Sequence, residues 1–486
     1  MVFSPFLSFF RRHKSDPQPA DFDTIPCTGL DLDARDLVIT NSFIIDTRLD
    51  VEKLDQTLCD LVQKKFPRAG ARLALRNGIY EFQIPRSFDP NTPPIAFTTD
   101  NYPEPYRSAS RPEIPGSSSS KPSILTAPAF EVYLKSKTCP TSFEDFLLPN
   151  VPLVHLHVTT FDDLTFIGVT STHITFDAMG TQALLYAWTR LINGEDIRSI
   201  SGMNWNVAPF EAFRENQTAP TTLTSKRGWF ALGFFARLSF IVRFTLRILR
   251  DPEEVRCIVH VPKKFLDDSK RDIMETQKLQ GSTEWVSSSD VLLAWWFKTV
   301  FSHRRVNDTT PIHIHIPTDL RKTPIFHGGS TLSTPYINNA VSTIPVPPVP
   351  VNTFRKETLG EIALRIRRAI IAYNADLDGI RDSVRFRCTH PLKLVFPSAP
   401  HGEYGVQTNW RAAKFGELDF SGARSPGSAE RARVVFMLGY PSSGKFVPMR
   451  GSGAILWEDE DSVWMGQVRG KKDWDAIRRS GNVAFI

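Results

Sequence analysis

Strand-like and helix-like segments alternate along both halves of this chain, and this alternation restricts the possible folds more than any other feature. Apolar residues recur at every second position in the strand-like runs and at helical spacing between them. In the first half, the strand-like and helical segments lie at residues 30–46, 51–66, 67–75, 78–84, 151–161, 164–174 and 178–194. In the second half, they lie at residues 256–262, 287–301, 311–317, 358–376, 433–441, 453–459 and 462–468. Helices that alternate with mixed strands pack as layers, so we expect an α/β (α+β) fold of two similar mixed-sheet domains.

The chain length and composition fit two large domains. The chain has 486 residues, and an apolar fraction of 41% excludes a disordered or fibrous protein. Lys and Arg exceed Asp and Glu by only six, which argues against a nucleic-acid-binding protein. Residues 201–228 are polar and irregular, so we place a crossover linker there. The N-terminal half is then residues 1–200, and the C-terminal half is residues 229–486.

The cysteine pattern and the N-terminal residues indicate the cellular compartment in which the protein folds. The five Cys are odd in number, lie far apart and form no CxxC pair, which favours a reducing compartment over a disulfide framework. In the opening sequence MVFSPFLSFFRRHK, apolar residues precede basic ones, the reverse of a secretory signal. No charge-free apolar run reaches the length of about 18 residues that a spanning helix needs. We therefore expect a cytoplasmic monomer without a transmembrane segment.

Two further stretches stand out by composition. Residues 229–250 are apolar but carry arginines, and three of these, Arg243, Arg247 and Arg250, fall within about 60° on a helical wheel. We favour an amphipathic helix that covers a core, and a helix that docks on a membrane surface or a partner remains the alternative. Residues 101–128 are rich in Pro and Ser, so we expect a surface loop or mobile insertion there.

A histidine stands where a predicted strand meets a predicted helix, in the sequence STHITFDAMG of residues 171–180. Loops at such junctions present functional side chains on a rigid frame, and the near-neutral pKa of histidine suits His173 to general-base catalysis. Asp177 can hold the turn that presents His173 or pair with a cation, and Gly180 allows close backbone approach at the first helical turn. The HxxxD spacing alone is weak, because a histidine after a strand is often purely structural.

Other polar motifs predict no separate site. The pairs His155/His157 and His313/His315 each place two imidazoles on one strand face, but neither has an acidic or Cys partner nearby in the sequence. We therefore expect no metal site. The run 442–445, SSGK, resembles part of a phosphate loop but lacks the GxxxxGK[ST] pattern, so we expect no nucleotide site there.

The segment around His173 resembles the HxxxD motif of the BAHD acyltransferase family, and the resemblance extends over most of the chain. Residues 49–73 look like the family's first helix followed by its FPxxAGRL stretch. Residues 287–300 resemble the helix that opens the second half, and residues 318–321, TDLR, resemble the DxR element. Residues 408–410, TNW, stand where many members have T-S-W.

The family's second signature, DFGWG, is degraded in this chain. Residues 418–423 read LDFSGA, so Asp419, Phe420 and Gly422 remain, while Ser and Ala replace the Gly and the Trp. This departure is typical of divergent, fungal-type members and argues against a plant-like substrate. The resemblance therefore implies an acyltransferase of secondary metabolism.

The resemblance also implies a chloramphenicol-acetyltransferase-like fold whose two domains enclose a channel. An acyl-CoA, by default acetyl-CoA, would enter from one side, and a small metabolite with a hydroxyl or amine from the other. His173 would take the acceptor's proton in a ternary complex, with no acyl-enzyme and no permanently bound cofactor. Thr408 and Trp410 become candidate donors or channel walls. Asp177 is expected to turn away from the substrate into an ion pair, and Asp419 is expected to be structural and to pair with Arg321.

Two rival hypotheses remain open. A condensation-type domain of peptide synthesis carries HHxxxDG, whereas position 172 here is Thr and the glycine falls one residue later, at 180. A non-catalytic homologue would bind a ligand without turnover, and the presence of His173 argues against it. Release of free CoA thiol from acetyl-CoA discriminates between turnover and binding alone.

Overall fold

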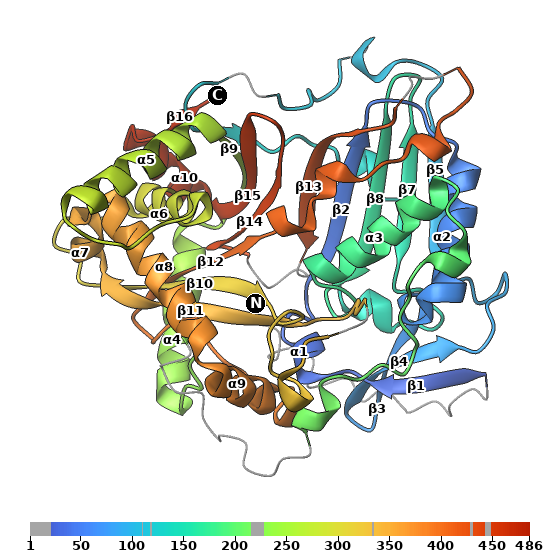
Figure 1. Cartoon of the computed structure of the whole chain (residues 1–486), viewed down its shortest axis with the longest axis horizontal. Helices are drawn as coiled ribbons and strands as arrows, with labels where there is room; N and C mark the ends of the chain where they lie inside the picture. The colour runs from blue at the N-terminus through green and yellow to red at the C-terminus, as the bar shows by residue number, and fades with distance from the viewer. Residues whose placement is uncertain are drawn as a thin grey trace.

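The computed structural model describes residues 21–108, 110–116, 119–214, 228–332, 335–427, 431–442 and 449–486. Within these ranges the chain forms two lobes that lie side by side, each built on a large sheet (Figure 1). The strands of both large sheets run in mixed directions and helices pack against them. This confirms the predicted α/β fold with mixed sheets.

A five-stranded sheet is the framework of the first lobe. Its order is β13 (Val434–Ser442), β2 (Val38–Ile45), β8 (Thr165–Thr172), β7 (His155–Thr160) and β5 (Ala96–Asn101). Neighbouring strands are antiparallel except β5 and β7, which are parallel. Helices α2 (Val51–Lys65) and α3 (Ala178–Ile192) pack on each other and cover one face (Figure 1). The helical spacing predicted α2, and its apolar residues Leu54, Leu58 and Leu61 are fully buried.

A small antiparallel sheet of β1 (Phe22–Pro26), β4 (Ile79–Pro85) and β3 (Arg72–Arg76) adjoins this lobe. A short helix, α1 (Gly29–Leu32), links β1 toward β2. The Thr28 hydroxyl accepts a hydrogen bond from the backbone N–H of Asp31 (3.2 Å), and the Asp31 carboxylate accepts one from the backbone N–H of Thr28 (2.7 Å). This capping box starts a helix, so the strand predicted over residues 30–46 is wrong before Val38.

An eight-stranded sheet is the framework of the second lobe. Its order is β11 (Val341–Pro350), β10 (Pro311–Asp319), β12 (Glu403–Asn409), β14 (Ser452–Glu458), β15 (Ser462–Gly470), β9 (Glu254–Pro262), β6 (Ser123–Thr126) and β16 (Ala484–Phe485). Helix α6 (Ser288–Phe301) packs against α8 (Leu359–Ala375) and is buried over most of its length. The remaining helices described are α4 (Phe234–Arg250), α5 (Lys263–Leu279), α7 (Val351–Lys356), α9 (Leu377–Thr389) and α10 (Lys471–Arg479).

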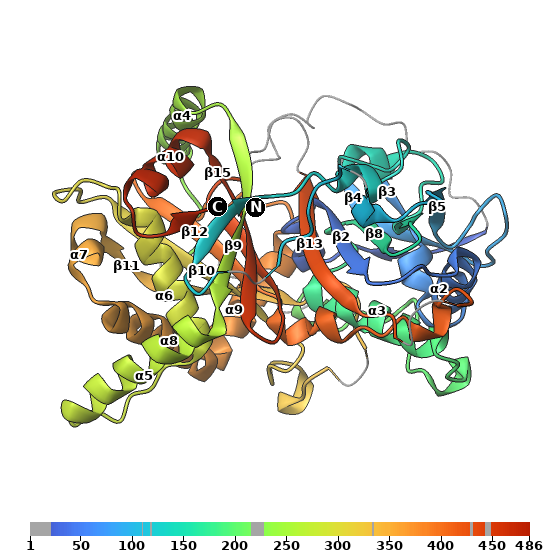
Figure 2. The same ribbon diagram turned by 90° about the horizontal axis from the view of Figure 1, so that it is seen from above.

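The two lobes exchange strands. Strand β13, from the end of the chain, pairs with β2 along eight residues of the five-stranded sheet, and β6, from the first half, pairs with β9 in the eight-stranded sheet. Figure 2 shows the orange-red β13 lying beside β2 in the lobe of the first half. Each large sheet is thus complete only with a strand from the other half. The boundary at residues 201–228 stays a prediction, and residues 215–227 lie outside the described ranges.

Two segments differ from their predicted structure. The predicted loop at residues 101–128 ends in β6, because the edge of β9 offers backbone partners to residues 123–126 that composition cannot reveal.

Helix α4 exists, but it covers the core mainly through Phe240, which packs on Phe396 with ring centroids 4.8 Å apart. Most of its large apolar side chains are exposed, so the favoured core-covering interpretation is wrong for that face. In the described part of the chain, no helix has the length and hydropathy to cross a membrane.

Candidate active site

A cavity of about 800 Å³ lies between the two large sheets. Its wall includes residues of β2 and β13 on one side and of β9, β12, β14 and β15 on the other. His173, Thr408 and Trp410, which the sequence singled out from distant segments, all line this cavity. The fold therefore brings these three candidates to one chamber between the lobes.

The turn after β8 places His173 in the cavity wall. β8 ends at Thr172, and the backbone N–H of His173 still donates to the carbonyl oxygen of Leu37 at 2.7 Å, which fixes the start of the turn. The side chain is half-buried, and its Nδ1 is buried without a hydrogen-bond partner among the described residues. Burial lowers the pKa of His173 below its ordinary 6.5, and nearby groups, including the Asp177 carboxylate, oppose this shift only in part. The imidazole is therefore neutral at pH 7 and able to accept a proton.

Asp177 is the N-cap of α3 and is fully engaged with protein groups. One carboxylate oxygen accepts from the backbone N–H of Gly180 at 2.7 Å, and the other accepts from the backbone N–H of Ala340 at 2.9 Å. Both oxygens also accept from the guanidinium of Arg321, at 2.9 and 3.0 Å. The side chain is almost fully buried. A bidentate, buried pair of this kind is among the stronger charge interactions in proteins.

Arg321 links the first lobe to the end of β10 in the second. Besides Asp177, it donates to the Asp319 carboxylate at 2.7 Å and to the carbonyl oxygens of Tyr336 and Asn338. Burial lowers the pKa of Arg321, but the two carboxylates outweigh burial and hold it above its ordinary value. The guanidinium therefore stays charged, and it ties the turn that carries His173 to the second lobe.

Two consecutive asparagines complete this connection, and the sequence reasoning missed them. The side-chain amide of Asn339 donates to the carbonyl oxygens of His173 (2.6 Å) and Ile174 (3.2 Å), and that of Asn338 donates to the carbonyl oxygen of Thr175 (3.1 Å). Both side chains are buried. The sequence YINNA of residues 336–340 could have pointed to them, because it places two amide side chains among apolar residues. Amide side chains that are buried nearly always have hydrogen-bond partners.

Gly180 allows the backbone of α3 to approach the same segment. A Cβ added at this position would lie 1.8 Å from the carbonyl oxygen of Ile337, closer than any side chain tolerates. Glycine is therefore required by close approach rather than by backbone conformation. Within eight residues, the HxxxDxxG spacing thus places His173 in a turn, Asp177 at the helix cap and Gly180 in close contact with the second lobe.

Thr408 is the next-to-last residue of β12, and Trp410 comes directly after the strand. Both are half-buried in the cavity wall, and the backbone N–H of Trp410 donates to the carbonyl oxygen of Ile455 at 2.8 Å. Asn409 lies between them and its side chain reaches the hydroxyl of Ser289. All three residues line the cavity where β12 ends.

The degraded second signature lies away from the cavity, at the C-terminal end of α3. The side-chain amide of Asn193 donates to the carbonyl oxygen of Asp419, and its oxygen accepts from the backbone N–H of Gly422, both at 2.8 Å. Phe420 is fully buried with its ring edge-on to Trp188. A Cβ at Gly422 would lie 2.2 Å from the carbonyl oxygen of Ile192.

The predicted pair between Asp419 and Arg321 is therefore wrong. Arg321 lies at the N-terminal end of α3 and Asp419 at its C-terminal end, and 15 helical residues span about 22 Å. The Asp419 carboxylate instead accepts from the backbone N–H of Ser421 at 2.9 Å. The partner of Arg321 in the first lobe is Asp177.

Comparisons with known proteins place the chain among transferases. The sequence model of the Transferase family matches residues 140–426, more than half of the chain. Acetyltransferase sphE of Aspergillus fumigatus is 26% identical over 98% of both chains. O-acyltransferase pboC of Aspergillus ustus is 24% identical over 89% of this chain and 93% of its own length.

Solved structures of the same architecture cover nearly the whole chain. The crystal structure of Fusarium graminearum TRI101 complexed with coenzyme A and deoxynivalenol has a TM-score of 0.62 at 14% identity, over 93% of this chain and 96% of that one. Vinorine synthase has a TM-score of 0.55 at 14% identity, over 95% and 93% of the two chains. At this level of identity the likeness concerns the fold, and it confirms the predicted two-domain arrangement.

Proposed function

The chain belongs to the Transferase family of BAHD-type acyltransferases, and from this premise we propose that it moves an acyl group from a CoA thioester to a small secondary metabolite. The acceptor group is a hydroxyl or an amine, and acetyl-CoA is the donor that the relatives named acetyltransferases favour. The crystal structures of TRI101 with coenzyme A support a CoA thioester as co-substrate. The observation that carries the proposal is the position of His173, half-buried in the wall of a large cavity between the lobes.

In this proposal His173 acts as the general base. Its ring nitrogen takes the proton of the acceptor hydroxyl or amine while the acceptor atom bonds to the thioester carbonyl carbon. The tetrahedral intermediate then collapses, the carbon–sulfur bond breaks, and the proton passes to the leaving thiolate, which departs as free CoA. A cavity that holds both substrates supplies proximity, so no acyl-enzyme is required.

The neighbouring residues have positioning and wall roles in the proposal. Asp177 and Arg321 hold the turn of His173 in place and take no part in proton transfer, because every oxygen of Asp177 is already bonded to protein. Thr408 and Trp410 face the cavity from β12 and are candidates to contact the substrate or donate to the developing oxyanion. We assign the enzyme no resident metal or prosthetic group and propose that it acts as a cytoplasmic monomer.

The wall of the cavity supports an apolar acceptor. Trp229, Tyr373, Leu394 and Val395 of the second lobe line it, with Leu32 of the first lobe. Apolar walls bind ligands by excluding water, while a few polar groups fix the orientation. We therefore propose an acceptor with a mainly hydrocarbon skeleton and a free hydroxyl or amine.

The test is release of free CoA thiol from acetyl-CoA in the presence of a panel of hydroxylated apolar metabolites. General-base catalysis contributes about 10²–10⁴-fold, so His173→Ala should lower thiol release by at least a hundredfold. His327→Ala removes the same side chain from an exposed position outside the cavity and should retain wild-type activity. Equal activity of both variants would exclude His173 as the base. An inactive wild type that binds CoA would favour the non-catalytic homologue.

A further inference from the structure

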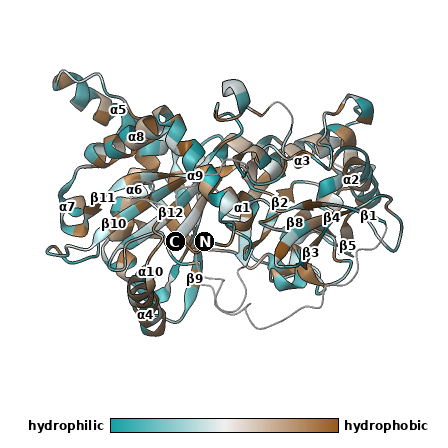
Figure 3. Ribbon diagram, turned by 90° about the horizontal axis from the view of Figure 1, so that it is seen from below, coloured by the Kyte–Doolittle hydropathy of each residue, from teal (hydrophilic) through white to brown (hydrophobic). Residues whose placement is uncertain are grey.

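Helix α4 turns a broad apolar face toward solvent. Six of its large apolar side chains are between 45% and 82% exposed, and Phe240 is its only buried residue. On a helical wheel of 100° per residue, the six fall within one sector of about 120°. Figure 3 shows α4 at the edge of the second lobe, coloured strongly hydrophobic. The six are Phe234, Phe235, Leu238, Val242, Leu246 and Leu249. A contiguous exposed apolar face marks an interaction site.

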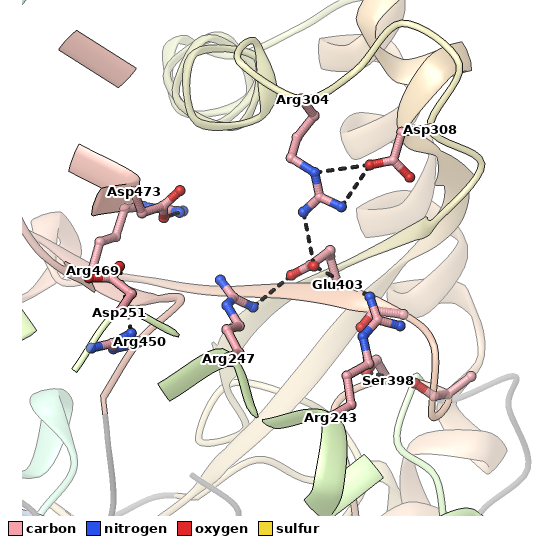
Figure 4. Close-up of polar contacts among 12 residues, drawn as sticks. Arg243, Arg247, Asp251, Arg304, Asp308, Ser398, Glu403, Arg450, Arg469 and Asp473 are labelled. Carbon is pink, nitrogen blue, oxygen red and sulfur yellow. Dashed lines mark hydrogen bonds and ion pairs between the residues drawn. The ribbon is translucent and has the colours of Figure 1, made fainter. Parts of the chain in front are cut away.

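An ion-pair cluster beneath α4 fixes this unusual orientation. The buried carboxylate of Glu403, at the start of β12, pairs with Arg247 at 2.7 Å and with Arg243 at 3.6 Å, both from α4. Arg304, at the end of α6, approaches the same carboxylate at 2.9 Å and also pairs with Asp308 (Figure 4). Arg243 and Arg247 thus hold this side of α4 against the protein. Turning the apolar face inward would break these pairs and leave Glu403 buried without them, which is costly.

Cationic groups border the apolar face on both sides. On the wheel, Arg243 and Arg250 flank it on one side and Arg237 on the other, about 100–120° from its centre. A shallow groove of about 420 Å³ runs along the helix, with Leu238 and Val242 on its apolar side and Arg243 and Arg250 on its cationic side. α4 contains no acidic residue. This is the arrangement of an interfacial helix whose arginines extend to phosphates beside the buried apolar residues.

We propose that α4 docks the enzyme on the surface of an anionic phospholipid membrane. The six apolar side chains would enter the boundary between headgroups and acyl chains, and the flanking Arg237 and Arg250 would contact lipid phosphates. A second copy of the chain fits less well, because pairing two α4 faces would bring arginines together with no acidic residue on either helix. The docking is peripheral, since α4 cannot span a bilayer.

The test is co-sedimentation of the full chain with vesicles. Wild type should pellet with vesicles of equimolar phosphatidylcholine and phosphatidylserine, and less with phosphatidylcholine alone or at high salt. L238E/V242E should lower the bound fraction at least tenfold. The matched control L279E/I371E also replaces two exposed aliphatic side chains by Glu, on α5 and α8, and should bind as wild type does. All variants should keep the wild-type melting temperature, because the substituted side chains are exposed.

A second measurement does not depend on a disruptive variant. Phe235→Trp adds a fluorophore on the apolar face to the ten native tryptophans, so the emission of the variant minus that of wild type should shift to the blue only with the anionic vesicles. Failure of wild type to bind either vesicle would overturn the proposal. Loss of vesicle binding by L279E/I371E to the same extent as by L238E/V242E would also overturn it. So would a wild-type protein that binds no vesicles but forms a dimer in solution, if the L238E/V242E variant were monomeric.

Discussion

The carboxylate of Asp177 offers the sharpest test of how the two lobes hold the candidate active site. Asp177→Ala removes two bonds to the buried Arg321, one to the backbone of Ala340 and the helix cap at Gly180. Breaking a buried ion pair costs about 3–5 kcal/mol, because the remaining charge stays buried. Arg321 keeps Asp319 as a partner, so we expect the lower end, about 3 kcal/mol.

Urea unfolding at pH 7 measures this loss. Asp177→Asn keeps a cap acceptor and should recover about 1 kcal/mol relative to Asp177→Ala. Asp419→Asn is the matched control, because that carboxylate is on an exposed residue and, among the described residues, accepts a local backbone N–H from Ser421, so its loss should cost less than about 1 kcal/mol. An Asp177→Ala variant within 1 kcal/mol of wild type would refute the assigned role of the ion pair.

The same substitution has a kinetic signature that a purely structural role would not produce. The negative charge of Asp177 raises the pKa of His173 against the effect of burial. In Asp177→Asn the pKa of His173 should therefore fall, and the acidic limb of the kcat/KM profile against pH should move to lower pH. An unchanged limb, or a move to higher pH, would show that the two groups do not interact as described.

Two further results follow from close packing and from burial. Gly180→Ala should lower the free energy of unfolding by about 1–3 kcal/mol and lower kcat, because the added Cβ would clash with the carbonyl oxygen of Ile337 beside the turn of His173. Gly422→Ala should lower the free energy of unfolding by a similar amount. It should leave the kcat of the folded enzyme unchanged, because Gly422 lies at the far end of α3 from His173. Burial lowers the pKa of His315 to about 4, so as pH falls below 6.5 the unfolded chain takes up the proton first. His315 should therefore contribute about 1.4 kcal/mol per pH unit to the loss of stability between pH 6.5 and pH 4, and His315→Gln should reduce the slope by that amount in urea titrations at stepped pH.

Local signals predicted the elements whose residues carry their own periodicity. The apolar residues of α2 recur at helical spacing, so its position could be read from the sequence. The short helix α1 was misread because its apolar alternation imitates a strand, although the Thr28–Asp31 capping box was present. Helix α5 was missed although its buried Leu266 and Ile273 recur at helical spacing, because few other apolar residues accompany them in a mainly charged segment.

Elements that depend on distant partners could not be predicted. β6 is a strand only because β9 pairs with it, and the position of β13 beside β2 joins residues almost 400 positions apart. The partner of Arg321 was assigned to the wrong carboxylate for the same reason. Two acidic residues at opposite ends of α3 are equivalent in a sequence, and only the packing of the lobes distinguishes Asp177 from Asp419.

The candidate active site is therefore a property of the contact between the lobes. His173 and its turn come from the first half, but the groups that hold the turn through side chains, Arg321, Asn338 and Asn339, all come from the segment between β10 and β11. The exchange of β13 and β6 fastens the two sheets around the cavity that this turn faces. Neither half alone contains both the imidazole and the groups that position it, so the geometry needed for proton transfer exists only when the lobes are docked.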